Sequence, residues 1–233
     1  MAFIHGKGAG VFVADFDLSG DLTQYNFTKT RQLVNVTTFG NDDKVFLAGL
    51  GEGRISGQGV WNPVLSDVEI VALDGVETVI TASPTAAAAI GDRAHMVNGF
   101  LDSFQPRAPV NDAVRFSSGF MASAGAYTGV VLHENAQESG TGNHASVNQT
   151  AQSANGATAF LHVTQFDGTN ATVTIEDSAN DSTFASLVAF SQATGVTSEK
   201  VTVAGTVEQY VRVALTGTFT TITFVVSFAR HLP

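Results

Sequence analysis

An acidic, turn-rich segment near the start of the chain has the residue types of a cation site. Asp15, Asp17 and Ser19 offer oxygen atoms at alternate positions, and Gly20 stands sixth, as at the start of a calcium-binding loop. The twelfth position, where a bidentate glutamate belongs, is Asn26, and the flanking residues have the alternation of strands. We therefore interpret the segment as a polar turn between two strands and predict no metal there.

Histidines are the other side chains that could do acid–base or metal chemistry. The chain has six, His5, His95, His133, His144, His162 and His231. None stands in an H-x-x-x-H or H-E-x-x-H spacing or in a nucleophile motif. His162, among alternating apolar residues, is interpreted as half-buried and hydrogen-bonded. The glycine-rich runs 6–10 and 49–53 lack the ending and context of a phosphate loop. We predict no catalytic residue, cofactor or metal, and no enzyme.

Composition narrows the class of protein further. The 233 residues include no cysteine, which excludes disulfides and thiol chemistry. With 11 basic and 21 acidic residues the net charge is -10, so there is no basic surface for gripping phosphates. Only 14% of residues are charged, against about 25% in typical domains, which favours a β-protein or one that hides its surface in an assembly. Short apolar runs predict no membrane insertion and no signal peptide, so we expect synthesis in a cytoplasm.

Period-2 alternation dominates the chain and predicts strands. In the last third, alternation is clear at 171–177, 209–215 and 221–228, with turn residues between the runs. Earlier strands are predicted at 10–16, 22–29, 31–38, 44–47, 53–60, 95–104 and 113–121. The spacing of strands and turns is typical of sandwiches and barrels.

One helix is predicted near 63–73. Asn62 is a good N-cap, Pro63 suits the first helical position, and Gly75 follows the end. Val64, Val68, Val71 and Ala72 form the apolar stripe of an amphipathic helix. Small residues near 123–125 suggest a boundary between residues 1–125, a β-domain with this helix, and residues 126–233, an all-β sandwich. Each part has a net charge of −5, so the surplus of acidic residues is spread over both parts and is not gathered in an acidic tail.

An ordered series of short motifs resembles the major tail (tail tube) proteins of long-tailed, siphovirus-like bacteriophages. In the first part the matching segments are 17–22 (a D-L-S-G-x-L entry), 36–44 (a T-T-F-G turn), 47–50, 53–59, 91–93, 108–112 and 120–125. In the second part 131–133, 140–143, 174–178, 184–187 and 210–213 resemble an appended tail β-sandwich. The family's Gly-Asp turn is here Gly40-Asn41-Asp42. The two matches span most of the chain.

The resemblance implies a structural virion protein with a tail-tube-like β-sandwich or barrel, one flanking helix and a second sandwich. Such subunits form hexameric rings that stack into a tube around a lumen for the tape measure protein and, later, for DNA. The partners implied are further copies of the chain, tape measure, tail terminator and baseplate or tip proteins, with DNA passing without tight binding. The implied location is the virion tail, after assembly in the host cytoplasm. Asp42, Asp43 and Glu52 are the residues expected at contacts between rings.

Two other functions remain open from the sequence. A capsid-decorating or tail-surface protein would present its β-sandwich outward. A carbohydrate-binding module would need exposed aromatic residues, whereas Phe160, Phe166, Phe184 and Phe190 are predicted to point inward by alternation.

Overall fold

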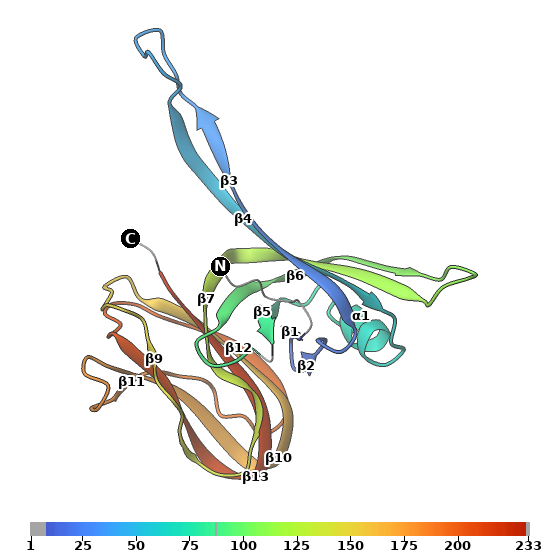
Figure 1. Ribbon diagram of the computed structural model, residues 1–233, viewed down its shortest axis with the longest axis vertical. Helices are drawn as coiled ribbons and strands as arrows, with labels where there is room; N and C mark the ends of the chain where they lie inside the picture. Colours follow the sequence, from blue (N-terminus) through green and yellow to red (C-terminus); the bar gives the residue numbers. More distant parts are fainter. Residues whose placement is uncertain (1–7, 87, 232–233) are drawn as a thin grey trace.

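Backbone hydrogen bonds join the strands of the chain into one antiparallel sheet of 13 strands (Figure 1). The computed structural model describes residues 8–86 and 88–231, so His5 lies outside the described residues. The strands are β1 (Ala9–Val13), β2 (Phe16–Asp17), β3 (Leu22–Asn35), β4 (Phe46–Val60), β5 (Thr78–Ala86), β6 (Arg93–Arg107), β7 (Arg115–Glu138), β8 (Gly142–Asn143), β9 (Val147–Asn148), β10 (Ala157–Ser178), β11 (Ala185–Ala189), β12 (Thr197–Val203) and β13 (Tyr210–Arg230). The predicted mainly β fold with one short helix is confirmed.

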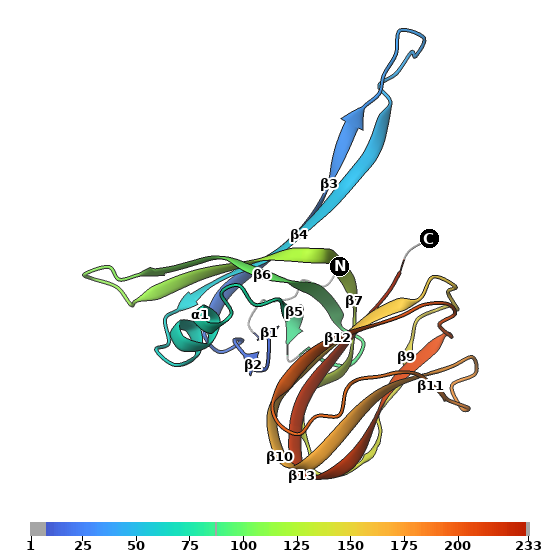
Figure 2. The same cartoon turned by 180° about the vertical axis from the view of Figure 1, so that it is seen from behind.

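Four strands in the order β3–β4–β7–β6 form what we call the wall of the first part. From β6 the sheet continues through β5 and β1 to β2. Two hairpins extend from this region in different directions, β3–β4 as a long arm and β6–β7 as a shorter projection (Figures 1 and 2). Strands predicted separately at 22–29 and 31–38 are the single strand β3, because a bulge between Arg31 and Leu33 shifts the register without ending the ladder.

The expected helix begins as a π-helical turn, η1 (Leu65–Glu69), and continues as α1 (Ile70–Ala72). Asn62 precedes its start, and the Asn62 Oδ1 atom accepts a hydrogen bond from the Val64 amide at 3.0 Å. The N-cap of η1 is Val64 and has no side-chain cap, so the helix begins later than the predicted Pro63. Gly75 follows its end, as predicted, with a φ of +74°. Among the described residues, no helix is long and apolar enough to cross a membrane.

The predicted apolar stripe of this helix faces solvent, which corrects the expected orientation. Val64, Val68 and Val71 are 62%, 59% and 47% exposed. Ile70 is fully buried instead, and Leu65 packs on the same core. The reason is the π-helical turn, whose i→i+5 hydrogen bonds put more residues in a turn than an α-helix has and so bring residues 65 and 70 onto one face. We call the three valines the helix valine surface.

The second part is built around β10 and β13, which pair along their full lengths and bend together (Figure 2). Bulges between Val163 and Asn170 mark the bend. β12 pairs with the first half of β10 and β11 with its second half. Residues from both halves of β10, such as Leu161 and Val173, lie in one core cluster. The strands predicted at 171–177, 209–215 and 221–228 all lie within β10 and β13.

Strand β7 connects the two parts without interruption. It pairs with β6 from Arg115 to Val130 and with β13 from Val130 to Glu138, and so passes through the predicted boundary at residue 125. A further core cluster contains side chains from both sides of that boundary, including Phe12, Met96, Phe160 and Val225. The division into residues 1–125 and 126–233 stays a prediction.

A buried polar chain accompanies this shared core. The His162 ring is fully buried, not half-buried as predicted. Its Nδ1 atom donates to the Ala14 carbonyl at 2.7 Å, so Nε2 accepts from the Thr81 hydroxyl at 2.9 Å. The Ser227 hydroxyl lies 3.1 Å from that of Thr81 and can donate to it. Because burial outweighs the carbonyl contact, the pKa of His162 is lowered to about 4.

We expect His162 to make the protein less stable as the pH falls. Between pH 6.5 and about 4 the unfolded chain takes up a proton on this residue while the folded chain does not. Across the whole window the free energy of unfolding should fall by roughly 3 kcal/mol from this group. Urea unfolding at several pH values, for the wild type and His162→Gln, measures it. The variant should lose this share of the pH dependence. If the free energy of unfolding changed with pH equally in the wild type and the variant, the lowered pKa of His162 would be contradicted.

Candidate functional site: a polar wall face and an exposed arm

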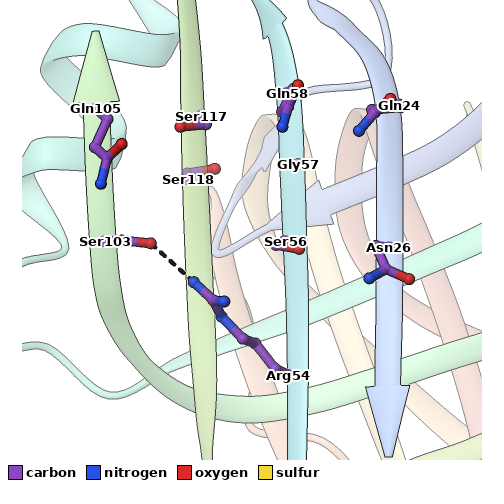
Figure 3. Close-up of a pocket in the computed structure, with 10 residues that line it drawn as sticks. All are labelled: Gln24, Asn26, Arg54, Ser56, Gly57, Gln58, Ser103, Gln105, Ser117 and Ser118. Carbon is purple, nitrogen blue, oxygen red and sulfur yellow. Dashed lines mark hydrogen bonds between the residues drawn. The ribbon is translucent and has the colours of Figure 1, made fainter.

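The outer face of the wall carries a groove lined mainly with uncharged polar side chains (Figure 3). Strand pairing places Asn26 of β3 beside Ser56 of β4, and Ser56 beside Gly119 of β7. The groove has a volume of about 250 Å³ and is lined by Gln24, Asn26, Arg54, Ser56, Gly57, Gln58, Ser103, Gln105, Ser117 and Ser118. We call it the polar groove.

Alternation along the same strands sends apolar side chains to the other face of the wall. Ile55, Phe116 and Phe120 are buried in the core of the first part, and Tyr25 and Phe27 pack against it. Burial raises the pKa of Tyr25 to about 12, so the phenol stays neutral. The groove therefore lies on a rigid support whose inner face is fixed by packing.

Arg54 is the one charged residue among those that line the groove, and Asp102 pairs with it. The Arg54 Nη2 atom lies 3.0 Å from Asp102 Oδ2 and 3.0 Å from Ser103 Oγ. To reach β6 the side chain crosses β7 (Figure 3), where a Cβ atom on Gly119 would lie only 2.2 Å from Nη2. The pair cancels the charge of the groove, although at this exposure it adds little stability.

Two glycine-to-alanine substitutions should differ in their cost to stability, because one new methyl group meets flexible side chains and the other meets the backbone. In Gly119→Ala the new methyl group meets the ends of Arg54 and Asp102, which can move, so we expect a loss below about 1 kcal/mol. In Gly99→Ala the methyl group would lie 1.8 Å from the Met121 backbone oxygen, so the β6–β7 ladder must shift, and we expect a loss of about 1–3 kcal/mol or more. Urea unfolding compares the two variants. Equal losses would contradict this account.

The β3–β4 hairpin beyond Thr28 is an arm (residues 29–52) with unusually exposed apolar side chains. Leu33, Phe39, Leu47 and Leu50 are 62%, 114%, 59% and 83% exposed. No described part of the chain covers them, as the isolated arm in Figure 1 indicates. Exposed apolar surface of this extent marks an interaction site.

The tip of the arm is held by its own hydrogen bonds. Asn41 Oδ1 accepts from the Thr38 amide and the Thr38 hydroxyl, both at 2.9 Å. Thr37 Oγ1 accepts from the Val45 amide at 2.9 Å, and the Val36 amide donates to the Val45 carbonyl. The Asn and Thr residues of the T-T-F-G turn thus give the tip a defined shape without packing.

The structure separates the three acids predicted at contacts between rings. Asp42 and Asp43 are exposed at the tip of the arm. Glu52 pairs with Thr30 near the base, six residues along β4 from Phe46, which is about 20 Å in an extended strand. Asp42 and Asp43 therefore lie together, and Glu52 lies apart from them. Their role between rings stays a prediction.

Sequence reasoning missed the polar groove and the exposed arm side chains. The signal for the groove was present, since Gln24 and Asn26 alternate with Tyr25 and Phe27. Uncharged polar residues at period 2 are the normal pattern of any solvent-facing strand, so they do not single out a site. The pairing of Arg54 with Asp102, 48 residues away, depends on the strand order.

Two other sequence predictions can be compared with the structure: the polar turn near Asp17 and the four phenylalanines predicted to point inward. Asp17 is the last residue of β2 and precedes a polar turn, where its Oδ1 atom accepts from the Ser19 amide at 2.8 Å and its Oδ2 atom accepts from Asn135 at 3.0 Å. Of the four phenylalanines, Phe160 and Phe190 are buried and Phe166 packs on the core. Phe184 is instead half-buried at the surface, where the guanidinium of Arg212 lies 3.8 Å above its ring. A flat aromatic platform for sugars is not formed by these four.

Among known proteins, the chain is similar to solved structures only. No protein-family model matches the chain, and no curated protein does. A chain of the "Virion of native gene transfer agent (GTA) particle" is 15% identical, with a TM-score of 0.44, over 54% of this chain and 98% of that one. A chain of the "Tail of empty GTA particle" is 15% identical, with a TM-score of 0.41, over 50% of this chain and 92% of that one. The SPP1 Dit (gp 19.1) protein is 12% identical, with a TM-score of 0.38, over 97% and 100% of the two chains. Similarity at this level does not assign a function.

Proposed function

We propose that the chain is a structural subunit of a bacteriophage tail, most specifically of the tail tube. In this proposal the wall closes into a ring with neighbouring copies and the arm reaches the next ring. The observation that carries the proposal is the pair of open edges on the wall. β3 pairs only with β4 among the described strands, and the outer half of β6, from Leu101 to Arg107, pairs only with β7.

Open edges favour assembly because unpaired backbone groups are templates for another strand. The two edges lie on opposite sides of the wall, so an edge of one subunit can pair with the other edge of the next. Contacts of this head-to-tail kind close into a ring when the rotation allows it. The resulting continuous barrel would leave no free edge.

Apolar surfaces next to these edges support the same arrangement. The helix valine surface borders a mixed depression beside the β6 edge, whose lining combines Val71, Leu101 and Phe104 with Asp74, Asp102 and Ser103. The apolar side chains of the arm have no cover within the subunit. Burial in a neighbour would account for both surfaces and for the low fraction of charged residues. Asp42 and Asp43 at the tip would then meet the adjacent ring.

The polar groove suits the surface of a lumen. Closure of the wall with its apolar face toward the core of each subunit turns the opposite face, with the groove, inward. Amides, hydroxyls and an internally paired arginine offer a passing phosphate chain no row of cations to hold it. Low friction for DNA would thus come from the neutrality of the groove itself. Arg107 and Arg115 line an adjoining pocket that shares Gln58, Gln105 and Ser117 with the groove, and Arg115 is paired with Asp112 at 3.3 Å.

The remaining details of the proposal rest on the motif resemblance. These are six subunits per ring, contacts with tape measure, terminator and baseplate or tip proteins, and a location in the virion. The second sandwich, residues 126–233, would lie on the outside of the tube.

Electron microscopy of the concentrated, purified protein tests the assembly. We expect rings and stacked tubes from the wild type. A triple variant, Leu33→Ser, Phe39→Ser and Leu47→Ser, should keep its free energy of unfolding within about 0.5 kcal/mol, because these side chains are exposed in the subunit. It should form rings but no tubes.

The matched control is Val196→Ser in the second part, where the valine is 50% exposed. This variant should assemble like the wild type. A protein that stays monomeric at every concentration would count against the tube, and unchanged tubes from the triple variant would count against the arm.

DNA chromatography tests the neutral lumen. We expect no retention of the wild-type protein on double-stranded DNA at ~50 mM salt, where electrostatic binding is strongest. Ser56→Lys, Ser103→Lys and Ser117→Lys together should introduce retention that decreases steeply with salt, because they place cations along the groove. Strong retention of the wild type would contradict the argument.

A further inference from the structure

A cluster of two histidines and a glutamate lies in the second part, outside the groove and the arm. His133 and Glu138 come from β7, and His144 follows β8. One ligand atom from each side chain lies within 4.8 Å of the other two. No sequence motif links the three residues, and they have no part in the proposed tail function.

A β-bulge brings the first two side chains together. Residues five positions apart on a regular strand point to opposite faces. Here His133 pairs with Val226 and Glu138 pairs with Ile222, so β7 advances five residues while β13 advances four. The extra residue restores the same face, and the His133 Nε2 atom lies 3.3 Å from Glu138 Oε1.

Hydrogen bonding fixes which nitrogen of His133 is free. The Nδ1 atom lies 3.1 Å from the Phe224 carbonyl, which can only accept, so Nδ1 carries the hydrogen. The ring is also held flat on Phe224, with centroids 3.9 Å apart and planes at 8°. In the neutral ring the lone pair on Nε2 therefore faces a carboxylate oxygen. Two electron pairs at this distance are held together by a proton on Nε2 or by a metal cation between them.

His144 completes the group from the other side. Its amide donates to the Val213 carbonyl at 2.8 Å, which anchors it to β13. Its Nδ1 atom lies 3.9 Å from Glu138 Oε1, and its ring meets His133 edge-on at a centroid distance of 4.3 Å. The Nε2 atom is buried without a hydrogen-bond partner. The position beside Glu138 and His133 is thus the main polar environment of this ring.

We propose that His133, Glu138 and His144 form a binding site for a late first-row divalent cation, with Zn²⁺ as the reference ion. Two imidazole nitrogens and a carboxylate oxygen are a ligand set of this class. Bonds of about 2.0–2.2 Å at tetrahedral angles place neighbouring ligand atoms about 3.4 Å apart, close to the 3.3 Å and 3.9 Å found here. The Nδ1–H to carbonyl bond of His133 is the usual outer-shell contact of a ligating histidine.

The ion would have a structural effect. It would tie the end of β7 to the β8 connection across β13, and a fourth position would remain for water. Glu138 and His144 are 30% and 17% exposed, which gives an ion access from solvent. The site does not depend on the tail function, and failure of one leaves the other intact.

Titration with Zn²⁺ tests the site. Tag-free full-length protein is stripped with a chelator, dialysed, and titrated with Zn²⁺ in competition with a chromophoric chelator. We expect one ion per chain and, at 100-fold excess over Kd, a rise in Tm of roughly 5–10 °C. Co²⁺ should give the visible absorption of a tetrahedral site with nitrogen and oxygen ligands.

Two variants assign the ligands. Glu138→Gln and His144→Gln should each weaken binding at least tenfold while keeping the circular dichroism spectrum of the wild type. The matched control is His95→Gln, a half-buried histidine stacked on Phe27 in the first part, which should bind like the wild type. No binding by the stripped wild type, or unchanged binding by both ligand variants, would overturn the proposal.

Discussion

The structure depends on the hydrogen bonding of one strand, β7, which has 24 residues and must satisfy partners on both of its sides. Its first third lies between β4 and β6, and its last third pairs with β13. A change of register in β7 would therefore displace the polar groove and the bulge at His133 together. Such a change of register is prevented by buried side chains on one face of β7, such as Phe116 and Phe120, which a shift by one residue would turn toward solvent.

The shared core gives the two parts a fixed relation. Phe160 and Val225 of the second part pack with Phe12 and Met96 of the first, and His162 joins them by hydrogen bonds to Ala14 and Thr81. A buried neutral histidine between two satisfied partners costs little when its donor and acceptor are both used. It does, however, restrict the arrangement to one geometry, because a small rotation would leave both ring nitrogens unpaired.

Sequence patterns predicted where the strands and the helix lie better than how these elements pair and pack with one another. Alternation located most strands, and Asn62 and Gly75 located the helix, because these signals act within a few residues. The orientation of the helix could not be predicted, since a π-helical turn changes the period on which the valine stripe was calculated. Small residues near Gly125 suggested a boundary between two parts, and the continuous strand β7 runs through them, which no local pattern indicated. The histidine cluster depends on a bulge, for which the local sequence has no distinctive signal.

The arm has a consequence for how separate copies of the chain behave in solution. Exposed apolar residues on a two-stranded ladder, such as Leu33 and Leu47, are a hazard for disordered aggregation. The chain counters this hazard with charge, because Asp42 and Asp43 at the tip and a net charge of -10 repel like copies at a distance. Attraction is short-ranged and repulsion is long-ranged, so the ionic strength of the medium sets the barrier to encounter. Charge repulsion thus opposes early contact between the exposed arms of two copies, and this opposition weakens as the salt concentration rises.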